Sequence, residues 1–161
     1  LVHHEVDLGL LTFQPHEPAL QSVDVATDSL ALVVSPTHSL AEKSMVSIRE
    51  LEMESFAAHN VVSPYRQKVM ETFQKHNTPL NINLELPSLD AIKRFIQMGG
   101  GIGILPLLAV KNELAHGLLT AIPIKEMQVK RKIYLCHRRK SGLSHAGQAF
   151  MKLAIGSHPV T

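Results

Sequence analysis

The chain has 161 residues, of which 45% are hydrophobic and 19% are charged, and its formal net charge is +2. A disordered chain would have fewer aliphatic residues or a larger net charge, and no apolar run reaches the roughly 18–20 residues of a membrane-spanning helix. The composition is therefore typical of a soluble globular protein with one domain or two small lobes. With a single cysteine, Cys136, the chain has no internal disulfide, which favours a reducing cytosol. Because the chain begins at Leu1 and not at methionine, we expect a segment upstream of it.

The first third of the chain alternates short apolar runs with polar connections. Residues 6–11 (VDLGLL) and 29–34 (SLALVV) are bounded by polar residues and predict buried strands. Residues 12–21 (TFQPHEPALQ) contain two prolines and predict a loop between them. Residues 46–51 (VSIREL) predict a short helical turn, which leads to another strand at 54–59 (ESFAAH).

Two helix starts follow. Ser63 can cap a helix and Pro64 suits its first position, with Val69, Met70 and Phe73 on the apolar face. After a predicted strand at 81–86, a second helix begins at Ser88, with its buried face formed by aliphatic and aromatic residues.

The stretch MGGGIGILP (98–106) ends that second helix. We expect Gly99 or Gly100 to adopt the left-handed cap conformation. The remaining glycines let a strand at 102–105 lie close to its neighbours, because no Cβ stands in the way.

The last third continues the alternation. Pro106 predicts the start of a helix that Gly117 closes, and residues 118–124 and 130–138 predict strands. Ser144 caps a final helix. Strands that alternate with helices of this length predict an α/β architecture with mostly parallel sheets.

Motifs for catalysis or cofactor binding are missing from the sequence. The glycines of 98–106 follow a helix and enter a strand, which is the reverse of a dinucleotide-binding loop, and no Lys-Ser/Thr pair follows them. His3 and His4 point to opposite faces if they lie on a strand, and neither they nor His16 have a matching carboxylate or thiol. No Gly-x-Ser-x-Gly motif occurs, and Cys136 lies inside a predicted strand. We therefore expect no metal, no cofactor and no enzymatic activity.

Two helix starts are candidates for binding an anion. Ser63 offers a hydroxyl beside free backbone N–H groups, Tyr65 offers a ring or a donor, and Arg66 can grip a carboxylate in bidentate fashion. Residues 86–90 (LPSLD) repeat this form around Ser88. In an open α/β sheet both would lie at the carboxyl edge of the strands, where ligands bind. The alternative interpretation is a pair of ordinary caps with a surface arginine.

The order of these segments resembles the C-terminal effector-binding domain of LysR-type transcriptional regulators. The segments that carry the resemblance are VDLGLL (6–11), LALVVSPTHSLA (30–41), VSIREL (46–51), SPYRQKVMETFQKHN (63–77), LELPSLDAIKRFIQMGGGIGILP (84–106), GLLTAIPI (117–124) and IYLCHRRKSGLSHAGQAFMKL (133–153). One departure is Ser39, which stands where the family usually has proline.

The resemblance implies an α/β, two-lobe fold like that of type 2 periplasmic binding proteins, with the lobes joined by two crossover segments. The crossovers would fall near 27–30 and 131–133. Residues 1–28 and 132–161 would form lobe I, and 29–131 would form lobe II. Lobe I would be incomplete, because the family has further strands and helices before the segment that matches Val6, and a winged helix-turn-helix before those.

The resemblance also implies that the domain binds a ligand without catalysing a reaction. A small, anionic metabolite would occupy the cleft between the lobes, with residues 33–35 on its floor. The effector-binding residues would come from strand ends and helix starts: Thr12, Phe13, Ser63, Pro64, Tyr65, Arg66, Ser88 and Gly101.

The expected partners are a small-molecule effector and further copies of the chain, in a homodimer or tetramer. DNA would be bound only through the absent N-terminal domain, no membrane would be involved, and the location would be cytoplasmic. Two alternatives stay open: a secreted solute-binding protein of similar fold that serves a transporter, and a small α/β enzyme.

Overall fold

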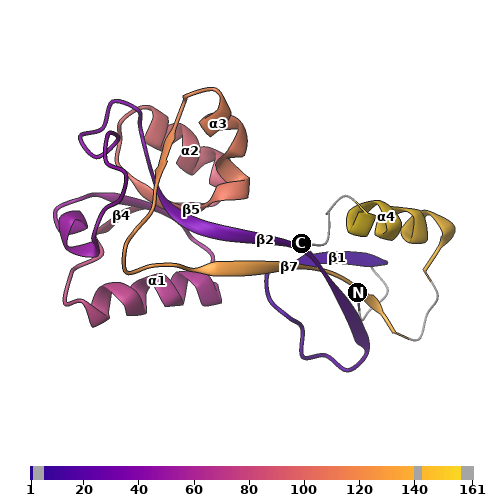
Figure 1. Cartoon of the computed structure of the whole chain (residues 1–161). Helices are drawn as coiled ribbons and strands as arrows, with labels where there is room; N and C mark the ends of the chain where they lie inside the picture. The colour runs from indigo at the N-terminus through magenta and orange to yellow at the C-terminus, as the bar shows by residue number, and fades with distance from the viewer. Residues whose placement is uncertain (2–5, 140–142, 157–161) are drawn as a thin grey trace. The chain divides into compact units, whose positions relative to one another are not determined.

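The computed structural model describes residues 1, 6–139 and 143–156 (Figure 1). The chain divides into two compact units: unit 1 contains Leu1–Asp28 and Lys130–Thr161, and unit 2 contains Ser29–Val129. The interpretation of these units as the two lobes of an effector-binding domain stays a prediction. His3 and His4, which the sequence analysis weighed as metal ligands, lie outside the described residues.

Unit 1 consists of strand β1 (Leu8–Leu11), the first part of β2 (Leu20–Val34), strand β7 (Lys130–Arg138) and helix α4 (His145–Gly156). β1 pairs with β7 in antiparallel fashion, and β7 is also a neighbour of β2. The expected cap of α4 is confirmed, because the Ser144 hydroxyl accepts a hydrogen bond from the backbone N–H of Gly147 at 3.2 Å.

Strand β2 is longer than the sequence predicts. It begins at Leu20, where the sequence predicts a loop, and continues for 15 residues. Its first part carries polar residues that hide the apolar alternation, among them Asp24 and Asp28. Both aspartates are paired with basic residues of β7, Lys132 and Arg131, and these partners are more than 100 residues away in the sequence.

Unit 2 contains strands β3 (Phe56–His59), β4 (Ile82–Leu86), β5 (Gly103–Pro106) and β6 (Thr120–Ile122) together with the end of β2. Helices α1 (Pro64–Lys75) and α2 (Leu89–Gln97) connect β3 to β4 and β4 to β5. The strands joined by these helices run parallel: β3 pairs with β4, and Phe56 forms a parallel bridge to Ile102.

The prediction of mostly parallel sheets is wrong for the remaining pairs. β2 is antiparallel to both β5 and β6, as β1 is to β7. A single helical crossover imposes parallel pairing only on the two strands that it connects. β2 is separated from β5 and β6, and β1 from β7, by several helices and strands in the chain, so the direction of these pairs is not fixed by such a crossover.

The core of unit 2 has two faces, because successive side chains of a strand point to opposite sides of the sheet. Leu32 and Val34 pack in a cluster that contains Val69 and Phe73 of α1. Val33, which lies between them, packs in a second cluster with Ile92 and other residues of α2. Figure 1 shows α1 on one side of this sheet and α2 with α3 (Lys111–Ala115) on the other.

The helix predicted from Pro106 to Gly117 is shorter than expected. A 3-10 turn, η2 (Leu107–Val110), precedes α3, which has only five residues. Val110 is fully buried and leaves the helical conformation at φ −111° and ψ 6°. The other predicted turn is present as η1 (Ile48–Leu51).

The expected left-handed cap of α2 is confirmed at Gly99, which has φ +76°. The Gly99 N–H donates to the carbonyl of Ile96 at 2.9 Å, and the Gly100 N–H donates to that of Phe95 at 3.1 Å. This pair of bonds is a Schellman motif, which satisfies carbonyls that the helix end would otherwise leave open. None of the described helices is long and apolar enough to cross a bilayer.

Candidate functional site

The two predicted helix starts lie at one edge of the unit 2 sheet. β3 and β4 are parallel with His59 opposite Leu86, and the N–H of Asn60 donates to the carbonyl of Leu86 at 3.1 Å. The loops beyond these residues lead to Ser63 and Ser88, so both serines follow the carboxyl ends of neighbouring strands. This placement agrees with the one that the sequence predicts.

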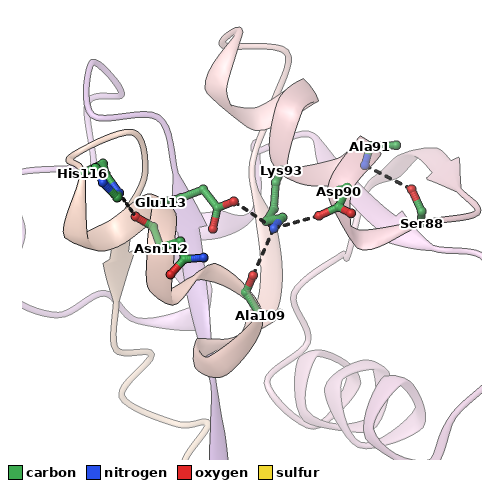
Figure 2. Close-up of polar contacts among 8 residues, drawn as sticks. All are labelled: Ser88, Asp90, Ala91, Lys93, Ala109, Asn112, Glu113 and His116. Carbon is green, nitrogen blue, oxygen red and sulfur yellow. Dashed lines mark hydrogen bonds and ion pairs between the residues drawn. The ribbon is translucent and has the colours of Figure 1, made fainter.

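Both serines cap their helices. The Ser63 Oγ accepts a hydrogen bond from the backbone N–H of Arg66 at 3.1 Å, and Pro64 is the first residue of α1. The Ser88 Oγ accepts one from the N–H of Ala91 at 3.2 Å (Figure 2). A serine hydroxyl that accepts one hydrogen bond still has a proton to donate, so capping is compatible with a contact to an anion. The role of these serines in effector binding stays a prediction.

Arg66 already holds partners within the chain. Its guanidinium forms an ion pair with the Glu85 carboxylate, and its Nη1 donates to the carbonyl of His59 at 2.6 Å. The side chain therefore ties the first turn of α1 to the ends of β3 and β4. An anion that binds Arg66 would have to compete with Glu85, so the predicted grip on an effector stays a prediction. Tyr65 beside it is half-buried.

The start of α2 carries a polar network around Lys93, which Figure 2 shows between α2 and the η2–α3 segment. The Lys93 Nζ lies 2.8 Å from Asp90 Oδ1 and 2.8 Å from Glu113 Oε1, and it donates to the carbonyl of Ala109 at 3.2 Å. Only 14% of the Lys93 side chain and 17% of the Glu113 side chain are exposed. Three acceptors thus occupy the three N–H groups of one ammonium.

The network holds all three groups in their charged forms. Hydrogen bonds to Asp90 and Glu113 raise the pKa of Lys93, and the hydrogen bond from Lys93 lowers the pKa of each carboxyl. The ammonium of Lys93 is thus paired with two carboxylates, those of Asp90 and Glu113. We conclude that Lys93 is a clamp between α2 and α3 and is not available as an anion ligand.

Gly101 has a packing role in the structure. Its φ is +155°, and a Cβ at this position would lie 2.6 Å from the carbonyl oxygen of Ser55. The predicted floor of the cleft, residues 33–35, is buried within unit 2, and the Ser35 Oγ hydrogen-bonds the Thr37 hydroxyl at 3.0 Å. Contacts of these residues with an effector stay predictions.

Thr12 and Phe13 directly follow β1. Thr12 is half-buried, and Phe13 is 51% exposed. Both belong to unit 1, whereas the other predicted site residues belong to unit 2.

The described residues show neither a metal-binding set nor an activated thiol. Within the described residues, no three His, Cys, Asp or Glu side chains gather as a metal-binding set. Cys136 is fully buried in β7, and burial raises the pKa of its thiol, which disfavours the nucleophilic thiolate.

The sequence pattern of the LysR substrate binding domain matches residues 1–157. The chain belongs to this family. Its two-unit α/β architecture is accordingly that of LysR regulatory domains, a fold like that of type 2 periplasmic binding proteins.

Curated relatives of this LysR-type domain include transcriptional regulators. It is 26% identical over 122 residues to the HTH-type transcriptional activator CmpR of Synechocystis. The matched region covers 76% of this chain and 40% of CmpR. It is 24% identical over 152 residues to the RuBisCO operon transcriptional regulator of Acidithiobacillus ferrooxidans, with 94% of this chain and 49% of the relative covered. The chain spans about half the length of the curated relatives that it matches.

Solved structures of LysR regulatory domains share the fold. The Synechocystis PCC6803 CcmR regulatory domain in complex with 2-PG has a TM-score of 0.83 at 29% identity, over 97% of this chain and 75% of that one. The effector-binding domain of QuiR in complex with shikimate has a TM-score of 0.79 at 23% identity, over 98% and 74% of the two chains. At that identity, the likeness to QuiR shows the fold alone.

Sequence reasoning missed the Lys93–Glu113 contact in this LysR-type domain. The spacing of Asp90 and Lys93 indicates a pair on one helix face. Nothing in the sequence indicates Glu113, because it lies twenty positions away on a helix whose placement depends on the packing of η2.

Replacing Lys93 by methionine is expected to lower the free energy of unfolding by about 1–3 kcal/mol at neutral pH, because Glu113 then keeps a largely buried carboxylate without its cation. Urea denaturation measures this loss. The Asp90→Asn variant is the control and should lose much less, since 84% of the Asp90 side chain is exposed.

The loss in Lys93→Met should depend on pH with a defined sign. Carboxyl groups with a lowered pKa stabilise the fold above their ordinary values, and this stabilisation disappears as pH falls through the folded-state pKa. Lys93, with its raised pKa, contributes below its ordinary value and ceases to do so at higher pH. The difference between wild type and variant should be constant between about pH 5 and 10 and should shrink in acid. A difference that stays constant down to pH 2 would contradict the clamp.

Proposed function

We propose that this chain is the effector-sensing domain of a LysR-type transcriptional regulator and that it binds a small, anionic metabolite without chemical conversion. The observation that carries the proposal is the family match over residues 1–157. Support comes from the CcmR regulatory domain, which is 29% identical and was solved with a small molecule bound.

We further propose how binding acts. An effector that favours one arrangement of the lobes tenfold shifts their equilibrium by about 1.4 kcal/mol, which biases a dimer without locking it. A DNA-binding domain in the same protein would read this change, in a cytoplasmic homodimer or tetramer. The match to a family of regulators favours this role over a transporter-associated solute-binding protein and over an enzyme.

The binding residues can be tested without damaging the helix caps. Aspartate caps a helix as well as serine does, but it adds a negative charge. Ser63→Asp and Ser88→Asp should therefore keep their stability and should weaken the binding of an anion at least tenfold. Isothermal titration of the intact protein with a panel of small acids, including 2-PG and shikimate, measures the affinity.

The matched control is Ser144→Asp, which makes the same change at the cap of α4; Ser144 is not among the predicted effector-binding residues. Its affinity should equal that of wild type. If Ser63→Asp and Ser88→Asp bind an acid as tightly as Ser144→Asp and wild type do, the prediction that Ser63 and Ser88 contact the effector is wrong. If no small acid binds the intact protein at all, the proposal that the effector is anionic is wrong.

A further inference from the structure

The chain passes between its units twice, and the two crossing strands are bonded to each other. β2 leaves unit 1 between Asp28 and Ser29, and the chain returns between Val129 and Lys130. β2 and β7 are hydrogen-bonded neighbours in the sheet, and the Leu30 N–H donates to the carbonyl of Val129 at 3.1 Å just beyond the boundary.

A buried ion pair stands beside this boundary on its unit 1 side. The Arg131 Nε and Nη2 donate to the same oxygen, Asp28 Oδ2, at 3.1 and 2.8 Å. Only 1% of the Asp28 side chain and 16% of the Arg131 side chain are exposed. Two charges removed from water in this way must stay together, because separating them leaves each one buried without its counterion.

The register of the crossing strands decides whether this pairing survives. A slip of one residue moves every side chain to the other face of a strand, and a slip of two residues keeps the face. The residues two positions from Arg131 are Val129 and Ile133, both aliphatic. A slip of either size therefore takes Asp28 away from Arg131.

The same two strands carry a second ion pair that differs in exposure. Lys132 Nζ lies 2.7 Å from Asp24 Oδ2, but 60% and 41% of these side chains are exposed. Water screens such a pair, so its loss costs little stability, and the pair does not specify the register of the strands. It is a built-in control for the buried pair.

We propose that the Asp28–Arg131 pair is a register lock, which makes the two crossover strands move as one two-stranded ribbon instead of sliding past each other. This function goes beyond the sensing proposed above and does not require an effector. In a sensor, the lock would pass a movement through both crossovers at once.

Residue-resolved hydrogen exchange of the intact protein tests the lock. The readout is the exchange rate of the Leu30 amide divided by that of the Ala57 amide, which donates to the Ile102 carbonyl within unit 2. In Asp28→Asn this ratio should rise at least tenfold, because the crossing strands open locally while the core of unit 2 stays closed. In the control Asp24→Asn it should change less than twofold.

A second variant separates register from stability. Asp28→Leu/Arg131→Met removes both charges of the pair together, so its denaturation midpoint should fall less than that of Asp28→Asn. Its Leu30-to-Ala57 ratio should nevertheless rise at least tenfold, since aliphatic side chains accept several registers. If both amides accelerate by the same factor in either variant, or if Asp24→Asn has as large an effect as Asp28→Asn, the pair is a general stabilising contact and the register lock is wrong.

Discussion

Replacing Gly101 by alanine is expected to destabilise the protein by at least about 3 kcal/mol and to lower its melting temperature by about 6–12 °C. Two costs combine. An L-residue at φ +155° is strained, and the new Cβ would lie 2.6 Å from the Ser55 carbonyl oxygen. That oxygen cannot move away without loss, because it accepts the hydrogen bond from the Ile102 N–H at 2.9 Å, where β5 meets β3. Differential scanning calorimetry measures the shift.

Gly99→Ala is the matched control two positions earlier. Gly99 has φ +76°, but nothing lies within 4 Å of a Cβ at this position. Only the conformational cost of about 1 kcal/mol should appear. Equal losses in the two variants would show that the approach of Ser55 does not limit the choice of residue at 101.

Replacing Phe73 by alanine is expected to cost about 3–5 kcal/mol of unfolding free energy. The ring is 1% exposed and contacts Phe56 edge to face, with ring centroids 5.7 Å apart. Its removal loses the buried apolar area and the aromatic pair and leaves a cavity between α1 and the sheet. Urea denaturation measures the loss.

Met70→Ala on the same helix is the control for Phe73→Ala. The sequence predicts Met70 on the apolar face of α1, and this prediction is wrong, because its side chain is 50% exposed and lies outside both core clusters of unit 2. Its truncation should cost well under 1 kcal/mol. A cost for Phe73→Ala as small as this would contradict the assignment of the ring to the core.

The boundaries of α1 and α2 were predictable because their causes are local, whereas the boundaries of α3 were not, because Val110 leaves the helical conformation where it is buried. Ser63 and Ser88 cap helices through N–H groups only three residues away, and Gly99 ends α2 because it can adopt a positive φ. Each of these features depends on a few consecutive residues. The resemblance to the LysR family, which rests on the order of such segments, was predictable for the same reason and is confirmed by the match over residues 1–157.

The candidate site was predictable only in part. The sequence placed Ser63 and Ser88 at the same edge of the sheet, because parallel neighbours end together. It could not show that Arg66 would be paired with Glu85, nineteen positions away, or that Lys93 would be held by Glu113. A long basic side chain can reach many carboxylates, and only the packing of the elements selects one.

Local chemistry thus determines the ends of helices that carry a serine cap or a glycine cap, such as α1 and α2, and the order of the segments identifies the family. Tertiary packing determines the length of β2, its antiparallel neighbours and the partners of the buried charges. Asp24 and Asp28 make the first part of β2 look like a loop in the sequence, and they are accommodated in a strand because Lys132 and Arg131 of β7 form ion pairs with them. Such a pairing joins residues more than 100 positions apart. It can therefore stabilise the fold only after the chain has returned to unit 1.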